Sequence, residues 1–267
     1  MNASSVQSNN KTNYEVKGSG QPLVLIHGVG LDLTMWEGIV AELSSQFKII
    51  TFDLFGNGNS AHPEGPYSLS KYANQLNELL QELKIEKAHI LGFSLGGLVA
   101  MKFALLYSQK TTSIVVVSAV SNRTVEERAI IQLRVKKTEE EGHLSVVDDS
   151  IDRWFDQKFK AQYPEVVNRF RKRLEANEQK GYLASYRVYA NGDQELKHQL
   201  SDIKCPALVM TGGEDPRSHT KMAMYMGEQI SNSTVKIIPG IRHMLPIEAP
   251  NEFNQMVKSF LTSLPES

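Results

Sequence analysis

Predominantly apolar runs alternate with segments of helical spacing along most of this chain. The apolar runs cover 22–26, 47–52, 88–91 and 113–118, and runs of this kind are typical of parallel strands that are buried on both faces. Between two of them, the segment 72–83 places its apolar side chains at the spacing of a helix. This alternation predicts an α/β fold with a mostly parallel, doubly wound sheet.

The strand pattern stops between about 123 and 200, where the sequence is helical, charged and aromatic. We therefore predict a helical cap at 123–200, inserted after the sixth strand of a core domain that comprises 13–122 and 201–267. The polar segment 1–12, which is rich in Ser and Asn, predicts a disordered tail.

Local signals mark where two of the helices begin. Thr34 and Glu37 stand at the spacing of a capping box, which predicts a helix that begins at Thr34 and ends near Leu43. Pro250 suits the first turn of a helix and predicts the start of the last one.

Composition limits the classes of function. An apolar content of 41% and a charged content of 22% are ordinary for a globular domain, and a net charge of −1 offers no basic surface for nucleic acid. The chain has neither a long apolar run typical of a transmembrane helix nor the apolar core of a signal peptide, so we expect a cytoplasmic protein that does not bind membranes. Its single cysteine, Cys205, excludes an intrachain disulfide and a cysteine zinc cluster.

The segment Gly92-Phe93-Ser94-Leu95-Gly96 connects a predicted strand to a predicted helix. In this context Gly-x-Ser-x-Gly is typical of a nucleophile elbow, a sharp turn that lifts the serine hydroxyl clear of the sheet. The two glycines leave room where a Cβ would collide with the neighbouring strand or helix. Ser94 is therefore the candidate nucleophile.

A serine hydroxyl needs a base within hydrogen-bonding reach and a group that orients the base. Further apolar runs at 206–211 and 234–238 predict two more strands. Of the seven histidines, His243 follows the last of these strands after a Pro-Gly turn, and functional groups gather at the strand ends of parallel sheets. The chain order Ser–Asp–His then favours Asp215, which follows the preceding strand, as the orienting acid. Glu214 is the alternative, because a one-residue shift of the loop would present it instead.

Other candidate polar residues have simpler interpretations. His89 lies inside a predicted strand and is expected in the core, whereas His143 and His198 lie in polar parts of the insertion and are expected at the surface. Asp53 also ends a strand but precedes the serine in the chain. We therefore expect it to have a structural role in its glycine-containing loop.

The negative oxygen that develops during acyl transfer needs two N–H donors. The backbone N–H of Leu95, at the N-terminus of the helix after the elbow, is one candidate. The other candidate is the backbone N–H of Val29, in the loop after the 22–26 strand, where Gly28 and Gly30 permit a close approach.

Together these motifs resemble the α/β-hydrolase superfamily, and the resemblance covers nearly the whole chain. It rests on His27-Gly28, the loop 53–60, the segment 92–97, Gly213-Glu214-Asp215 and the segment 243–250. Within the superfamily, the segments 152–155 and 163–165 are similar to the 3-oxoadipate enol-lactonase branch. The resemblance implies an α/β-hydrolase fold with a serine nucleophile.

Two places depart from the pattern of that superfamily. Arg242 stands where a glycine commonly precedes the catalytic histidine, and its guanidinium either faces the imidazole and lowers the pKa of His243 or points to solvent. Phe55 and Asn57 replace the arginine and histidine that are usual in the 53–60 loop, so the polarity of the pocket does not follow from the resemblance.

The insertion at 123–200 would cover the strand ends above Ser94. Its aromatic side chains either line a substrate pocket or form a small core of the insertion itself, and their helical spacing favours the core for most of them. They are Trp154, Phe155, Phe159, Tyr182, Tyr186 and Tyr189. The resemblance favours Trp154 as a pocket residue, and Phe93, beside the nucleophile, is the second candidate.

These features predict a serine hydrolase that cleaves a small carboxylic ester or lactone through an acyl-enzyme, with no metal or other cofactor. An enol-lactone is the specific substrate that we favour. A carbon–carbon bond hydrolase would use the same triad, and a small-molecule receptor with this fold could retain the triad with little turnover. The sequence leaves these alternatives open.

Overall fold

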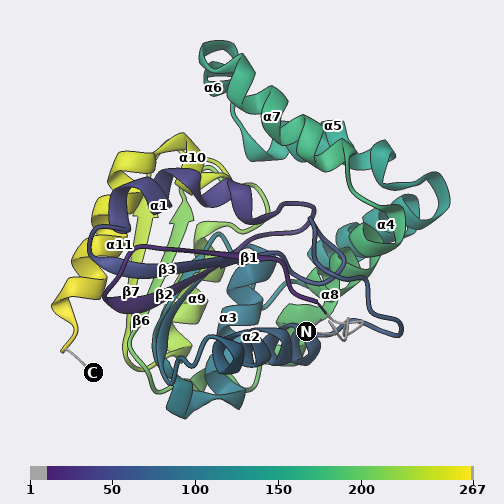
Figure 1. The fold of residues 1–267 in the computed structure, drawn as a ribbon. Coiled ribbons are helices and arrows are strands. Elements are labelled where there is room, and N and C mark those ends of the chain that lie inside the picture. Colours follow the sequence, from purple (N-terminus) through teal and green to yellow (C-terminus); the bar gives the residue numbers. More distant parts are fainter. Residues whose placement is uncertain (1–10, 266–267) are drawn as a thin grey trace, which may run out of the picture.

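The computed structural model describes residues 11–265, in which seven strands form one sheet in the order β1-β3-β2-β4-β5-β6-β7 (Figure 1). Strand β1 is antiparallel to β3, and all other neighbouring strands are parallel. The strands are β1 (Tyr14–Lys17), β2 (Gln21–Ile26), β3 (Phe47–Phe52), β4 (Ala88–Phe93), β5 (Thr111–Val117), β6 (Ala207–Gly212) and β7 (Ser233–Ile238). The predicted α/β architecture is confirmed.

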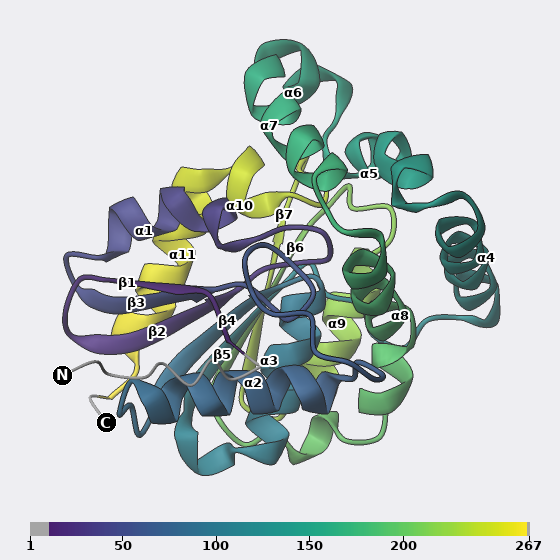
Figure 2. The same ribbon diagram turned by 45° about the vertical axis from the view of Figure 1, so that its right-hand side comes forward.

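Helices cover both faces of the sheet, as Figure 2 shows, and the strands β4 and β6 are buried along their whole length. Helices α1 and α11 contact each other on one face, α2 and α3 contact each other on the opposite face, and α9 packs on β6 and β7. These helices are α1 (Glu37–Leu43), α2 (Leu69–Glu82), α3 (Leu95–Leu106), α9 (Thr220–Gln229), α10 (Leu245–Glu248) and α11 (Pro250–Ser263).

Within the described chain, five α-helices are inserted between β5 and β6, and we call this segment the cap. They are α4 (Val125–Glu141), α5 (Val147–Trp154), α6 (Gln157–Gln162), α7 (Pro164–Glu175) and α8 (Gln179–Leu196). The cap therefore follows the fifth strand and not the sixth, because the first 122 residues contribute only five described strands. Helices α5, α6 and α7 extend beyond the sheet in Figure 1, whereas α8 returns and packs against α3.

The first helix begins differently from the prediction. Asp32, rather than Thr34, caps it, since Asp32 Oδ1 accepts hydrogen bonds from the Thr34 backbone N–H at 3.0 Å and from the Thr34 hydroxyl at 2.6 Å. A 3-10 turn, η1 (Leu33–Trp36), comes next, and α1 starts only at Glu37. The other 3-10 turns are η2 (Ser108–Lys110), η3 (His143–Val146) and η4 (Leu200–Asp202).

Most of the predicted N-terminal tail, residues 1–10, lies outside the described residues. Lys11 and Thr12 already contact the core: the Lys11 carbonyl accepts a hydrogen bond from the Ala61 N–H at 2.9 Å, and the Thr12 hydroxyl accepts one from the Gln75 side chain at 3.2 Å. Among the residues from 11 to 265, no helix combines the length and the apolar character needed to cross a membrane.

Candidate active site

Ser94 occupies the single-residue turn between β4 and α3. Its backbone angles, φ 54° and ψ −111°, fall where non-glycine residues are rarely found, as the predicted elbow requires. The flanking residues, Gly92 and Gly96, must be glycines because the tight turn leaves no room for a side chain at either position. A Cβ on Gly92 would lie 2.0 Å from the carbonyl oxygen of Gly96, and a Cβ on Gly96 would lie 2.2 Å from that of Ile26.

His243 and Asp215 reach the end of the sheet near Ser94 from the loops after β7 and β6. Asp215 Oδ2 lies 2.6 Å from His243 Nδ1, and both side chains are almost fully buried. Asp215 Oδ1 accepts hydrogen bonds from the backbone N–H groups of Arg217 and Ser218, each at 3.0 Å, which fix the carboxylate. Glu214 is exposed. Of the two candidate acids, the structure therefore places Asp215 against the imidazole.

The charges of this pair follow from burial and from two nearby arginines. Burial opposes ionisation of Asp215, but the His243 cation, its hydrogen bond and the Arg153 guanidinium outweigh it and lower the pKa of Asp215 to about 2. Burial lowers the pKa of His243 below its usual range; the Asp215 carboxylate opposes this, and the Arg153 and Arg217 guanidiniums add to it. The imidazole is thus uncharged near pH 7, the form that can accept a proton.

Ser94 and His243 line one cavity, which is closed by the cap. The core side is formed by Val29, Phe93, Ser94 and His243, and the cap side by Arg134, Ser150, Arg153, Trp154, Tyr182, Tyr186 and Tyr189. Within the described chain no hydrogen bond yet joins the serine hydroxyl to the imidazole, and such bonds commonly tighten when substrate binds. The cavity measures about 10 Å³, which is room for about one water molecule.

The two pocket candidates named from the sequence, Trp154 and Phe93, both pack next to the ring of His243. The ring centroids are 6.4 Å apart for Trp154 and His243 and 5.0 Å apart for Phe93 and His243. Both side chains line the cavity. The base is therefore enclosed by one aromatic ring from the core and one from the cap.

Four of the six cap aromatics line the cavity with Ser94: Trp154, as expected, and the three tyrosines of α8, for which a core of the cap itself was expected. Phe155 and Phe159 stack on each other away from this cavity, with centroids 5.2 Å apart. The tyrosines line the cavity and also stack on one another, Tyr182 on Tyr186 and Tyr186 on Tyr189, with centroids 5.9 Å apart in each pair. The tyrosines at 182, 186 and 189 share one face of α8, and helical spacing says nothing about which surface that face meets.

The loop after β2 approaches the nucleophile closely. A Cβ on Gly28 would lie 3.3 Å from Ser94 Cβ, and Val29 lines the same cavity as Ser94. Leu95 is the first residue of α3, so its N–H is one of the N-terminal donors that the helix itself leaves unpaired. The structure thus brings both predicted oxyanion donors, Val29 and Leu95, next to Ser94.

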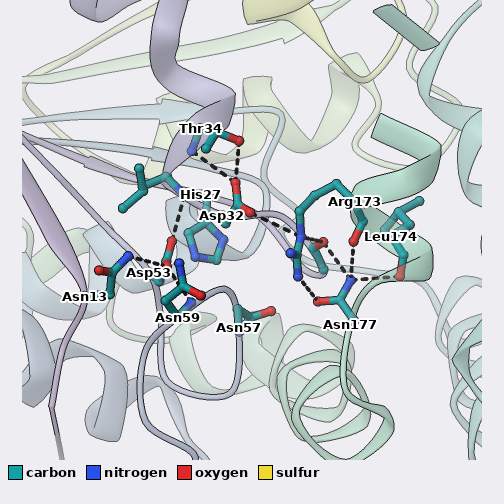
Figure 3. Close-up of polar contacts among 12 residues, drawn as sticks. Asn13, His27, Asp32, Thr34, Asp53, Asn57, Asn59, Arg173, Leu174 and Asn177 are labelled. Carbon is teal, nitrogen blue, oxygen red and sulfur yellow. Dashed lines mark hydrogen bonds and ion pairs between the residues drawn. The ribbon is translucent and has the colours of Figure 1, made fainter. Parts of the chain in front are cut away.

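Asp53 anchors this loop from the core side, as Figure 3 shows. Its Oδ1 accepts a hydrogen bond from the Leu33 N–H, and its Oδ2 accepts one from the Asn59 N–H, both at 2.8 Å. His27 Nε2 accepts a hydrogen bond from the Leu54 N–H at 2.9 Å. Asp53 therefore has the structural role that its position in the sequence predicts.

The guanidinium of Arg242 neither faces the imidazole of His243 nor points freely into solvent. Its Nη1 donates to the Asp152 carbonyl at 2.6 Å, which links the His243 loop to the cap. The cations whose charge reaches His243 are instead Arg153 and Arg217, which the sequence analysis missed. The available signal was position: one precedes the predicted pocket tryptophan, and the other lies two residues after the predicted acid.

Arg153 and Arg217 also line a second, larger cavity of about 440 Å³, which shares Arg153 and Tyr189 with the catalytic one. Neither arginine forms an ion pair with a carboxylate among residues 11–265. Four buried donors of residues that line these cavities lack partners in the same part of the chain: Arg123 Nη2, Arg153 Nη1, Trp154 Nε1 and the Tyr189 hydroxyl. Unpaired buried donors are costly, and a bound anion would satisfy them.

Three other histidines can be compared with the expectations from the sequence. His143 is buried, contrary to expectation: its Nδ1 lies 3.0 Å from Gln179 Oε1 and its Nε2 lies 3.3 Å from the Glu175 carbonyl oxygen. The ends of α7 and α8 pack over it, which its polar sequence neighbours could not indicate. His89 is buried in β4 and His198 is exposed, both as predicted.

Comparisons with known proteins agree with the fold. A family model described as the alpha/beta hydrolase fold matches residues 21–250. The chain is 31% identical over 260 residues to (E)-2-((N-methylformamido)methylene)succinate hydrolase of Acinetobacter baylyi, covering 97% of each protein. It is 26% identical over 251 residues to 3-oxoadipate enol-lactonase 2 of the same organism, covering 93% of this chain and 92% of the relative. The enol-lactonase structure from Burkholderia xenovorans superposes with a TM-score of 0.88 at 25% identity, over 95% of this chain and 97% of the other.

Proposed function

The chain belongs to the α/β-hydrolase family, and on this premise we propose that it is a serine hydrolase of small carboxylic esters or lactones. The observation that carries the proposal is the buried contact of 2.6 Å between Asp215 and His243, at a cavity that Ser94 and His243 share. A buried carboxylate behind an imidazole, facing a serine in an elbow, is the arrangement that activates a hydroxyl for acyl transfer.

Each residue has one task in this mechanism. His243 takes the proton of Ser94 as the hydroxyl attacks the carbonyl carbon, and it later gives the proton to the leaving oxygen. Asp215 holds the Nδ1–H tautomer of His243 and stabilises the imidazolium. The N–H groups of Val29 and Leu95 bind the oxyanion. Water, deprotonated by His243, then attacks the acyl-enzyme and releases the acid.

We also propose that the substrate carries a carboxylate away from the scissile bond. Arg153 and Arg217 have no carboxylate partner in the described chain, although both reach the cavity beside the catalytic one. Guanidinium groups suit carboxylates because they can donate two parallel hydrogen bonds. The names of two relatives, a succinate-derivative hydrolase and a 3-oxoadipate enol-lactonase, refer to acids of this kind. An enol-lactone with a free carboxylate is our favoured substrate.

The test of the triad is hydrolysis of p-nitrophenyl acetate by the wild type and by Ser94→Ala. We expect repeated turnover by the wild type, background rates for the variant, and an acyl-enzyme in the acid-quenched wild type by intact-protein mass spectrometry. Equal rates for the two proteins would refute the serine mechanism. Turnover of a ring-cleavage dienoate with no turnover of esters would favour the carbon–carbon bond hydrolase instead.

To test whether the substrate carries a carboxylate, kcat/KM is measured for a charged ester, monoethyl succinate, and for a neutral ester, ethyl butyrate. Arg153→Met and Arg217→Met should lower kcat/KM for the charged ester by at least about tenfold, which is the scale of one charge-assisted hydrogen bond. The neutral ester is the control and should be affected much less. Equal losses on both esters would show that these arginines support the fold and not the substrate.

A further inference from the structure

We propose that Asn177, in the cap, is a positioning residue for the oxyanion hole, so that the hole is complete only while the cap is docked. This inference rests on the proposed function. We define the oxyanion loop as residues 28–32, the segment that carries the Val29 N–H.

The core holds one side of the oxyanion loop. The Gly28 carbonyl accepts a hydrogen bond from the Leu31 N–H at 3.2 Å and lies 2.8 Å from His27 Nδ1. Beyond the loop, the Leu33 N–H is held by Asp53. These contacts tie the peptide that carries the Val29 N–H to the peptide between Gly30 and Leu31, and they hold the residue after the loop. Among the described residues of the core domain, the Gly30 carbonyl has no partner.

The cap supplies that partner. Asn177 Nδ2 donates to the Gly30 carbonyl at 2.9 Å, and Arg173 Nε lies 3.5 Å from the same oxygen. Figure 3 shows Arg173 and Asn177 reaching the loop from the cap helices, on the side opposite Asp53. The carbonyl is therefore clamped by two side chains that belong to the cap.

Asn177 is itself held in one orientation. It is 7% exposed, its Nδ2 also donates to the Leu174 carbonyl at 2.9 Å, and its Oδ1 accepts a hydrogen bond from Arg173 Nη2 at 2.9 Å. Arg173 continues to the loop, where its Nε lies 3.3 Å from Asp32 Oδ2. The Asn177 amide thus links the end of α7 to Gly30 by hydrogen bonds. Through Arg173 it is also connected to Asp32.

The cap also packs tightly on the loop at this point. Gly30 has a φ of +71°, and a Cβ there would lie 2.7 Å from Tyr182 Cε2 and 2.8 Å from Leu174 Cδ2. No side chain fits between the loop and the cap. Loss of the Asn177 amide would leave a buried carbonyl without its best donor, a cost that the loop relieves by moving.

A displaced Gly30 carbonyl moves the Leu31 N–H with it, because both belong to one peptide plane. That N–H donates to the Gly28 carbonyl, whose own peptide plane carries the Val29 N–H. Oxyanion stabilisation depends on donors placed near 3 Å from the developing charge, and a misplacement of about 1 Å can cost on the order of 10²-fold in rate. The cap therefore acts on the chemical step as well as on access to the cavity.

The experiment compares Asn177→Ala and Asn177→Asp with a matched control, Arg169→Ala. Arg169 also lies on α7 and reaches the core, through an exposed ion pair of 2.8 Å with Glu37. Within the described chain, no hydrogen bond or ion pair joins its side chain to the oxyanion loop. Two quantities are measured: kcat and KM for p-nitrophenyl acetate, and inhibition by butylboronic acid. The boronate forms a tetrahedral adduct with Ser94 and places an oxygen in the oxyanion hole.

We expect both Asn177 variants to lose about 10- to 10²-fold in kcat, with little change in KM, and to bind the boronate more weakly by a similar factor. Arg169→Ala should behave as the wild type in both assays. A role confined to stability would lower the unfolding temperature and leave kcat and boronate affinity of the folded protein intact. That result would overturn the inference.

A second variant covers the case in which the Asn177 proteins do not fold. Asp32→Asn retains a good N-cap residue but removes the ion pair with Arg173, and it should lower kcat and boronate affinity together; unchanged values would overturn the inference. Failure of the proposed function looks different. In that case wild type and Ser94→Ala hydrolyse the ester equally, whatever happens at Asn177.

Discussion

The indole of Trp154 stacks on the imidazole of His243, with ring centroids 6.4 Å apart and planes inclined by 24°. Trp154 belongs to the cap and His243 to the core, so a side chain of the cap covers the candidate base. The preceding residue, Arg153, adds a positive charge that depresses the pKa of His243. The cap therefore shapes both the surroundings and the charge of the base.

The pH dependence of activity follows from this charge. Because only the neutral imidazole accepts a proton, kcat/KM should rise with pH through the pKa of His243 in the free enzyme, below the usual value of 6.5. Arg153→Met removes a cation, raises that pKa, and should move the acid limb to higher pH on a neutral ester. Arg169→Met is the control on the cap surface. An acid limb at the same pH in all three proteins would contradict the prediction.

Replacement of the orienting acid should be far more damaging than replacement of its neighbour. Asp215→Asn is expected to lower kcat by on the order of 10⁴, because an asparagine favours the wrong tautomer of the base. Glu214→Gln, at the exposed adjacent position, should retain nearly the wild-type kcat. Steady-state rates on p-nitrophenyl acetate decide the matter, and a larger loss for Glu214→Gln would reverse the assignment of the acid.

Glu248, at the end of α10, should make stability depend on pH. Burial and the charge of Asp156 raise its pKa to about 7, and its Oε2 is buried without a partner in the described chain. Between the unfolded pKa of about 4.5 and about 7, the folded state then holds more protons, so this group makes the protein less stable as pH rises through that window. Thermal melts from pH 5 to 8 should show a smaller decline for Glu248→Gln than for the wild type. Identical declines would exclude the effect.

The contact between the cap and the 53–60 loop should tolerate no added side chain. A Cβ on Gly181, in α8, would lie 2.1 Å from the Gly56 carbonyl oxygen, so Gly181→Ala should destabilise the protein by about 1–3 kcal/mol. Gly38→Ala is the matched control, because a Cβ in α1 meets nothing within 4 Å, and it should stabilise by about 0.4–1 kcal/mol. Urea unfolding of both variants gives the comparison, and a neutral Gly181→Ala would contradict the packing described here.

The order of strands and helices, the elbow and the chain order of serine, acid and histidine could all be predicted from the sequence. These features depend on neighbouring residues: apolar periodicity decides strand or helix, and the glycines around Ser94 decide the turn. The start of the first helix was misplaced because Asp32 and Thr34 both have side chains that can cap, and the choice between them depends on how the chain leaves β2.

Other features required the tertiary structure. Which of two adjacent acids faces His243, which arginines reach it, and which face of α8 meets the cavity depend on how loops and cap helices dock. The contact of Asn177 with Gly30 joins residues that are 147 positions apart, and no local pattern encodes it. Local sterics and periodicity thus determined the scaffold and the nucleophile, whereas the environment of the base and of the oxyanion loop was decided by packing between segments distant in the sequence.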